Sequence, residues 1–172
     1  MFASRTLAAT PVNPIGLGCM NLSHAYGTPP STQDAQTLLF KALDLGYNHL
    51  DTATLYGFGN NETLLGNTLK GQRQQFFLAS KCGMAGVNGK RVIDGRPETL
   101  RRQADESLQR LQTDYVDLYQ LHWPNRGSYH FRQNWRFDPS LQSRSAPERM
   151  AEVVETLGAF IAEGKIRASG LS

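Results

Sequence analysis

The sequence is poor in cysteine, with two among 172 residues. Cys19 and Cys82 stand far apart, outside any Cys-x-x-Cys pair or other spacing typical of metal ligands. This excludes a disulfide framework and a cysteine-based metal centre, and we expect no bound metal. Both thiols are expected to be buried and free, in a reducing compartment.

Long apolar runs are also absent, since none approaches the roughly 20 residues that cross a bilayer. The first ten residues contain one arginine and lack the apolar core of a signal peptide. We therefore expect a cytoplasmic protein with no membrane partner. Neither sign of charge dominates, because 18 lysines and arginines oppose 15 aspartates and glutamates. The basic residues are scattered, which argues against a nucleic-acid partner.

Short apolar runs alternate with longer stretches of helical period, which is the signature of β-α-β units in a parallel sheet. Helices are expected to begin at a Ser31 cap, at an Asn60 or Asn61 cap, and with Pro97 in the first turn. A proline-rich lead-in can form a small hairpin. The length fits one domain, residues 1–172. Five strands are expected, at residues 15–20, 47–53, 76–81, 115–122 and 166–171.

This alternation fits either a doubly wound sheet or part of a barrel, and two observations favour the barrel. Gly16-x-Gly18 is followed by a loop, not by the helix that a dinucleotide-binding fingerprint requires. Polar residues also recur where the strands end, at Asp51, Lys81, His122 and Ser172. Barrels of this kind build their active sites at the C-terminal ends of the strands. The expected fold class is α/β, a parallel (β/α)8 TIM-barrel type that is truncated after the fifth strand.

Four of these side chains are candidates for catalysis: Asp51, Tyr56, Lys81 and His122. Each alone has an ordinary structural explanation. A strand-end aspartate often caps the next loop, a loop tyrosine usually packs, a strand-end lysine usually points to solvent, and a lone histidine is usually structural.

Together, in this order and spacing, the four residues resemble the catalytic tetrad of the aldo-keto reductase family. The resemblance covers essentially the whole chain. The motifs that carry it are Gly16-Leu17-Gly18-Cys19-Met20, Asp51-Thr52-Ala53 with Tyr56-Gly57, Asn61-Glu62 with Leu65-Gly66, Ser107 to Leu111, Asp114 to Leu118, and Gly164-Lys165-Ile166-Arg167. It implies an NADPH-dependent oxidoreductase that reduces aldehydes and ketones, with NADH not excluded.

The chemistry of carbonyl reduction explains why these four residue types are needed. Carbonyl reduction needs a hydride, which the resemblance assigns to the cofactor, and a proton on oxygen. A tyrosine has a free pKa of about 10, which a neighbouring ammonium lowers. The resemblance therefore makes Tyr56 the general acid and Lys81 the group that lowers its pKa. It makes Asp51 the residue that holds Lys81 in place, and His122 the residue that orients the substrate. It also implies cofactor contacts for Met20, Asp51 and Ser172, although Met20 can equally be a core residue.

The segment 125–145 interleaves aromatic residues with arginines. We expect an extended loop after the fourth strand, either a lid over the substrate or a segment packed on the barrel rim. Stacking on nucleic acid is disfavoured, because no basic helix or binding fold lies nearby.

Complete barrels have eight βα units in about 250 residues, so three units are missing here. The chain is expected to be a fragment of a longer protein or part of an assembly, and its open sheet edges favour self-association. Two alternatives to a reductase stay open: an inactive truncated remnant, and a non-catalytic relative of the kind that regulates potassium channels as a β-subunit.

Overall fold

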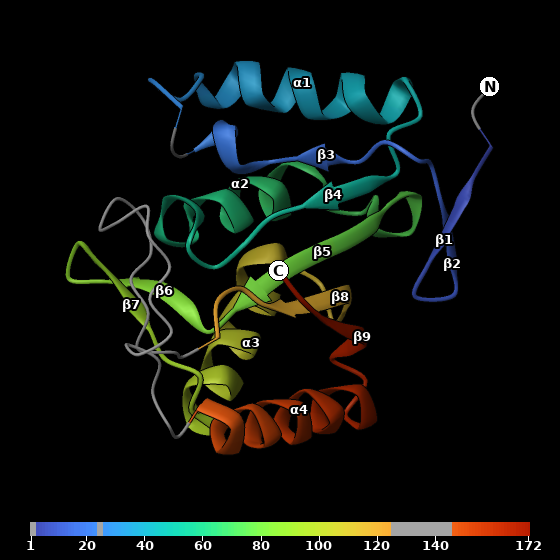
Figure 1. The fold of residues 1–172 in the computed structure, drawn as a ribbon. Coiled ribbons are helices and arrows are strands. Elements are labelled where there is room, and N and C mark those ends of the chain that lie inside the picture. Colours follow the sequence, from blue (N-terminus) through green and yellow to red (C-terminus); the bar gives the residue numbers. More distant parts are fainter. Residues whose placement is uncertain (1–2, 24–25, 125–145) are drawn as a thin grey trace, which may run out of the picture.

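The computed structural model describes residues 3–23, 26–124 and 146–172 of the chain. Its centre is a five-stranded parallel sheet, formed by β3 (Leu17–Gly18), β4 (His49–Asp51), β5 (Phe77–Cys82), β8 (Val116–Leu121) and β9 (Ile166–Leu171). The strands lie side by side in chain order (Figure 1). A doubly wound sheet would reverse its order at a switch point. The strictly sequential order is therefore that of a barrel wall.

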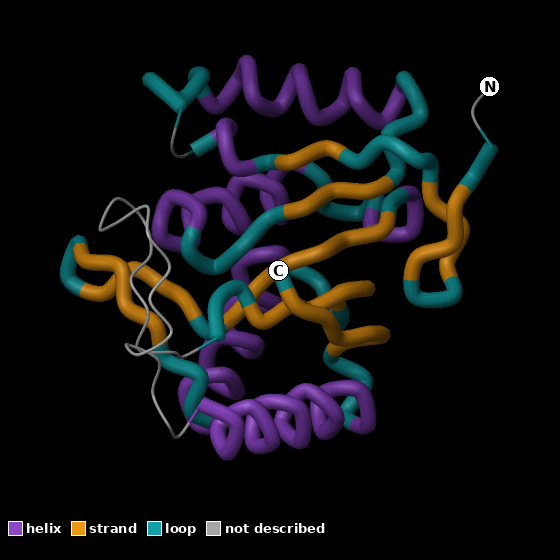
Figure 2. Tube along the Cα trace, in the orientation of Figure 1, coloured by secondary structure: helices purple, strands orange, loops and turns teal. Residues whose placement is uncertain are grey.

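The helices lie outside this sheet and connect its strands (Figure 2). They are α1 (Thr32–Asp44), α2 (Asn60–Thr68), α3 (Pro97–Leu111) and α4 (Ala146–Ala162). The predicted cap of α1 is confirmed, because the Ser31 hydroxyl accepts a hydrogen bond from the Asp34 amide at 3.1 Å. Pro97 begins α3 as expected. The predicted cap of α2 is wrong: Gly59 precedes the helix, and the Asn61 side chain is buried.

The main core fills the space between the helices and the sheet. It includes Leu39 of α1, Leu50 of β4, Leu100 of α3 and Phe160 of α4, all fully buried. Some apolar side chains of the outer helices are exposed, among them Leu38 on α1 and Val154 and Ile161 on α4. Helices α1 and α4 stand at the two ends of the helical layer, so each has a neighbouring helix on one flank only (Figure 1).

Two antiparallel hairpins lie at opposite ends of the sheet (Figure 1). The first, β1 (Arg5–Leu7) with β2 (Thr10–Val12), is the hairpin expected in the lead-in. Its Val12 packs on Phe77 and Ala79, so it covers the N-terminal end of the sheet. The second, β6 (Met84–Val87) with β7 (Lys90–Ile93), follows β5 and was not expected. Its two-residue turn, Asn88-Gly89, has positive φ at both positions, as type I′ turns require.

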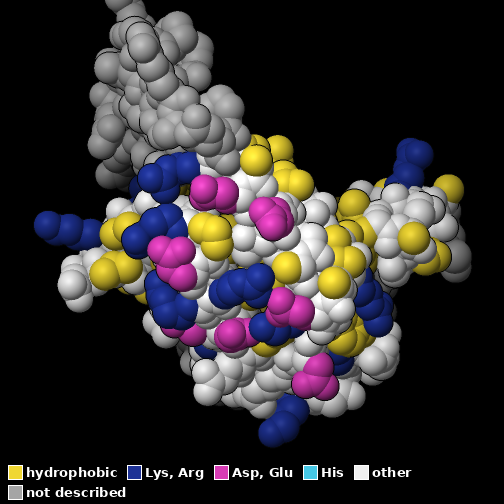
Figure 3. Space-filling model, turned by 90° about the horizontal axis from the view of Figure 1, so that it is seen from below, with side chains coloured by type: hydrophobic (Ala, Val, Ile, Leu, Met, Phe, Trp, Pro, Cys, Tyr) yellow, Lys and Arg dark blue, Asp and Glu magenta, His cyan; other side chains and the backbone are white. Residues whose placement is uncertain are grey.

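The five strands are confirmed, and β3, β4 and β8 are shorter than expected. Strand β3 ends where Cys19 leads into the 3-10 helix η1 (Met20–Leu22), so Met20 lies beyond the strand. Cys19 and Cys82 are free and fully buried, and burial raises the pKa of each thiol to about 12. No helix in the described ranges is long and apolar enough to cross a bilayer. Seen from below, acidic, basic and hydrophobic side chains are interspersed over the described surface (Figure 3).

Candidate active site

The parallel strands bring the predicted site residues to one edge of the sheet. Asp51 is the last residue of β4, Lys81 is the last but one of β5, and His122 and Ser172 directly follow β8 and β9. Leu121 is paired with Leu171, so His122 and Ser172 leave neighbouring strands at the same level. Side chains two apart on a strand point to the same face. Lys81 therefore shares its face with Ala79, which packs on the inner side of the sheet.

The Lys81 ammonium is the centre of the site. Its Nζ donates to a carboxylate oxygen of Asp51, to the Thr52 carbonyl at 2.8 Å, and to the Tyr56 hydroxyl oxygen at 3.1 Å. An ammonium has three donors, and all three are used. Lys81 is only 4% exposed, so these contacts are what makes the burial of its charge tolerable. Asp51, which was predicted to anchor this lysine, is thus one of its three acceptors.

A constrained loop delivers Tyr56 to this ammonium. The loop is tied to β5 by two backbone hydrogen bonds, from the Thr52 amide to Ala79 at 2.9 Å and from the Thr54 amide to Lys81 at 3.2 Å. Tyr56 begins the 3-10 helix η2 (Tyr56–Gly59), whose next residue, Gly57, has a φ of 56°. A Cβ on Gly57 would lie 2.9 Å from the Ser23 hydroxyl, so glycine serves both the backbone angle and the close approach.

His122 lies against Tyr56 in an uncharged form. The two rings make an edge-to-face contact with centroids 5.7 Å apart. Burial, reinforced by the positive charges of Lys81 and Arg91, lowers the pKa of His122 from 6.5 to about 4. The imidazole is therefore neutral near pH 7, with one N–H donor and one acceptor nitrogen. Its Nδ1 is buried, and nothing in the described part of the chain hydrogen-bonds to it.

Asn61 holds the loops of the site together, a role that the sequence did not reveal. Its amide nitrogen donates to the Cys19 carbonyl at 2.8 Å and to the Ser23 hydroxyl at 2.7 Å. Its oxygen accepts from the Thr52 hydroxyl at 2.7 Å. Asn61 thereby joins the loops after β3 and β4 and fixes the segment between Asp51 and Tyr56. Asn61-Glu62 is a recognisable motif in the sequence, but only the fold brings Cys19, Ser23 and Thr52 around Asn61.

Glu62, the other member of this pair, is a fully buried carboxylate behind β5. It accepts hydrogen bonds from the Ser80 hydroxyl at 2.5 Å and from the Arg110 guanidinium at 2.8 Å. Ser80 directly precedes Lys81 and points to the opposite face of the strand. Glu62 therefore fastens the outer side of β5 to α3, at the level where the inner side presents the ammonium.

The predicted cofactor residues lie at the same edge of the sheet. Met20, half-buried, begins η1 after β3, and Asp51 ends β4 with 31% of its side chain exposed. Ser172 is exposed, and its amide donates to the Leu121 carbonyl at 3.1 Å. The expected loop at 125–145 lies outside the described residues. Within the residues that the structure describes, no three histidine, cysteine or acidic side chains are grouped to hold a metal ion.

Comparison with known proteins identifies the family. The model of the aldo/keto reductase family matches residues 14–172. Aldo-keto reductase YhdN of Bacillus subtilis is 32% identical over 160 residues, which are 92% of this chain and 42% of that protein. Aldo-keto reductase yakc [NADP(+)] of Schizosaccharomyces pombe is 38% identical over 124 residues, which are 69% of this chain and 36% of that protein.

A solved structure, the holo form of aldo-keto reductase AKR11C1 from Bacillus halodurans, superposes with a TM-score of 0.78 at 33% identity. The superposition covers 100% of this chain and 50% of that one. The chain thus spans half or less of the length of these relatives. The predicted fold class, a portion of a (β/α)8 barrel that includes five of its strands, is confirmed. The chain belongs to the aldo/keto reductase family of oxidoreductases.

Proposed function

We propose that this chain carries the catalytic residues of an NADPH-dependent reductase of aldehydes and ketones, with Tyr56 as the general acid. The observation that carries this proposal is the contact of 3.1 Å between the Lys81 ammonium and the Tyr56 hydroxyl. In carbonyl reduction, Tyr56 gives its hydroxyl proton to the carbonyl oxygen. The positive charge of Lys81 then stabilises the negative charge that is left on the phenol oxygen.

His122 is suited to orienting the substrate and not to protonating it. Because its pKa is lowered to about 4, the imidazole carries no spare proton near pH 7. Its single N–H can still donate a hydrogen bond to the carbonyl oxygen and hold that oxygen beside Tyr56. This division of roles assigns the proton to the tyrosine and the positioning to the histidine.

The residues at the strand ends fit the nicotinamide half of the cofactor. The exposed Ser172 hydroxyl and the partly exposed Asp51 carboxylate are groups that hydrogen-bond a carboxamide, and Met20 offers an apolar contact. NADPH, when bound, supplies the hydride that the carbonyl carbon accepts. The yeast relative, whose name carries NADP(+), supports this choice over NADH.

The test is made in a full-length barrel that contains this chain. Replacing Tyr56 by phenylalanine should lower the turnover of a reactive aldehyde at least ~100-fold, the usual scale of general-acid catalysis. NADPH affinity, measured by cofactor fluorescence, should stay within about threefold, because the hydroxyl is assigned no cofactor contact. Lys81→Met should be comparably damaging, because it removes the positive charge that stabilises the phenol oxygen of Tyr56 after proton transfer.

Tyr47→Phe is the matched control, since Tyr47 lies before β4, at the other end of the strand from Asp51. Near-normal turnover in Tyr56→Phe would show that the acid is another group. NADPH binding without any aldehyde reduction in the unsubstituted protein would instead favour the non-catalytic, regulatory alternative.

A further inference from the structure

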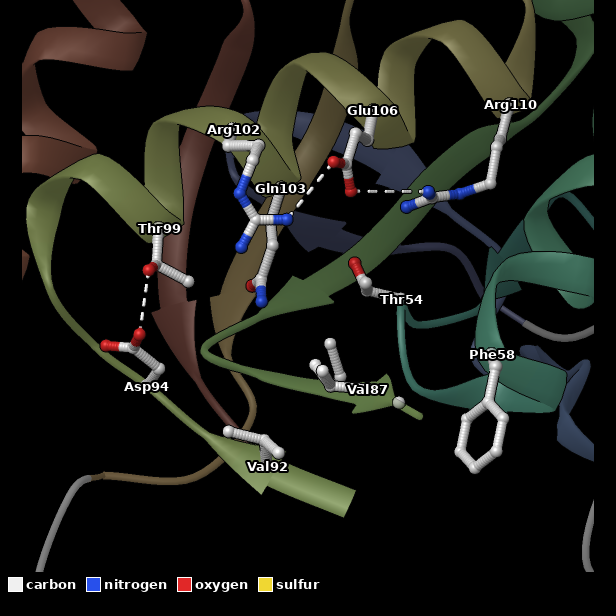
Figure 4. A pocket seen from close by; sticks show the side chains of 12 residues that line it. Thr54, Phe58, Val87, Val92, Asp94, Thr99, Arg102, Gln103, Glu106 and Arg110 are labelled. Carbon is white, nitrogen blue, oxygen red and sulfur yellow. Dashed lines mark hydrogen bonds and ion pairs between the residues drawn. The ribbon is translucent and has the colours of Figure 1, made fainter. Parts of the chain in front are cut away.

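A pocket lies on the outer side of the sheet, behind the loop that carries Tyr56. Its volume is about 120 Å³, and its walls come from α3, the β6–β7 hairpin and the catalytic loop (Figure 4). The loop contributes Thr54 and Phe58, which flank Tyr56 in the sequence. The Phe58 ring packs on the hairpin, since a Cβ on Gly86 would meet it at 2.1 Å. The pocket is therefore separate from the site at Lys81, which faces the inner side.

One polar group in this pocket lacks a partner. Gln103 on α3 is only 3% exposed, and its Oε1 accepts a hydrogen bond from the Gly83 amide at 2.7 Å. That bond fixes the side chain, which reaches from α3 toward the space between Thr54 and Val87 (Figure 4). Its Nε2 has no hydrogen-bond partner among the described residues. The Nε2 is thus a fixed amide donor on the pocket wall, which a ligand acceptor can meet in place of water.

The charges around the pocket are paired. Arg102 donates to Glu106 at 3.1 Å, and Arg110 lies 3.6 Å from the same carboxylate. Asp94 accepts from the Thr99 hydroxyl at 2.8 Å, and its contacts with Arg96 hold the pKa of this carboxyl well below its usual range. The walls thus offer donors but no excess of positive charge, which favours a neutral acceptor over an anion.

The side of the pocket opposite Gln103 is apolar. Val87 and Val92 of the hairpin and Phe58 of the loop form it, and each is partly exposed. Elsewhere, an engineered apolar cavity of about 150 Å³ binds benzene, so the present volume suits a molecule of about five non-hydrogen atoms. Its acceptor would meet Gln103 and its alkyl group would meet the two valines.

We propose that this pocket is a second binding site, for a small neutral carbonyl compound whose oxygen accepts a hydrogen bond from Gln103. Such an occupant touches Thr54 and Phe58, and so contacts the catalytic loop from behind. The site is independent of the reaction proposed above, because no residue of the Asp51, Tyr56, Lys81 and His122 set lines it.

Propionamide is a suitable probe, since it has an alkyl group and an amide carbonyl that does not accept a hydride from NADPH. It is titrated into the full-length barrel that contains this chain, and the methyl NMR signals of Val87 and Val92 are followed. We expect saturable shifts of both signals in the millimolar range. Propionate, the matched anion, should bind at least tenfold more weakly. Equal or tighter binding of propionate would refute the neutral class.

Two pocket variants and one control make the test specific. Gln103→Glu keeps the acceptor for the Gly83 amide and removes the free donor, so propionamide should bind at least tenfold more weakly. Val92→Phe fills the pocket from a partly exposed position and should abolish the shift of Val87. Val154→Phe, at an exposed position on α4, should leave the affinity unchanged.

The site would be refuted if propionamide caused no saturable shift. It would also be refuted if both pocket variants bound propionamide as tightly as the unsubstituted protein does. The readout does not depend on turnover, so its failure is distinct from failure of the reductase. Propionamide binding without aldehyde reduction would refute only the proposed reductase function. Aldehyde reduction without propionamide binding would refute only the second binding site.

Discussion

Three ionisable side chains lie at this end of the sheet, and their surroundings favour different charge states. Lys81 and Glu62 are buried, and His122 is half-buried. The Lys81 ammonium donates to three oxygens. Glu62, fully buried, is matched by the Arg110 guanidinium. His122 has no acidic partner within the described ranges and faces the positive charges of Lys81 and Arg91, so its neutral form is favoured. The one unpaired base of the site is thereby kept uncharged beside the proposed proton donor.

Because the folded protein disfavours protonation of His122, we predict that His122 contributes to a loss of stability in acid. The pKa of the folded state, about 4, is below the ordinary 6.5, so the unfolded chain takes up the proton first. The contribution of His122 to the free energy of unfolding is fully present above about pH 6.5 and is lost as the pH falls toward 4. It amounts to at most about 3 kcal/mol of unfolding free energy.

Urea denaturation of the full-length barrel at pH 7 and pH 4 measures this loss. His122→Asn should lose less stability between the two pH values than the unsubstituted protein does. The pKa of His49 is also lowered by burial, but that residue is present in both proteins and its contribution cancels. Identical pH dependence of the two proteins would contradict the assignment.

At the scale of elements, the sequence predicted the features that depend on local signals, and it did not predict those that depend on contacts between distant segments. The alternation of strands and helices, the Ser31 cap and the start of α3 at Pro97 are local signals, and each is confirmed. Asn88-Gly89 was an available signal for the β6–β7 hairpin, since this dipeptide favours two-residue turns. The partners of Asn61 and the pocket at Gln103 were not predictable, because they join segments that are distant in the chain.

The packing of α2 on α3 predicts a large effect of one methyl group. A Cβ on Gly66 would lie 2.2 Å from the Arg110 carbonyl oxygen and 2.9 Å from the Leu111 Cα. These are backbone atoms of a helix, which cannot swing aside as a flexible side chain can. Gly66→Ala should therefore destabilise the protein by about 3 kcal/mol, at the upper end of the cost of overpacking.

The same substitution elsewhere provides the control. Gly158 lies within α4, and a Cβ there would meet no atom within 4 Å. Gly158→Ala should stabilise the helix by about 0.5–1 kcal/mol, because alanine loses less backbone entropy on folding. Both free energies come from urea denaturation. A Gly66→Ala protein as stable as the unsubstituted one would show that α2 and α3 can separate without cost.

At the scale of the whole molecule, the five-stranded sheet is an open arc. Strands β3 and β9 form its two edges, and among the described residues each pairs with one neighbouring strand. The inner face carries small or polar residues toward its C-terminal end, such as Gln120 and Gly170, neither of which is fully buried. At the β9 edge, Leu171 is 67% exposed. Backbone groups at such edges are templates for pairing with another chain.

We therefore predict that the 172-residue chain on its own associates through these edges. Light scattering after size-exclusion chromatography should give a mass above the 19.1 kDa of one chain, rising with concentration. Leu171→Lys places a charge on the β9 edge and should shift the protein toward the monomer, because edge lysines oppose strand pairing. Val87→Lys, at a half-exposed position on the hairpin, should leave the mass unchanged. If the chain is monomeric at all concentrations, or if both variants lower the mass equally, association does not proceed through the β9 edge.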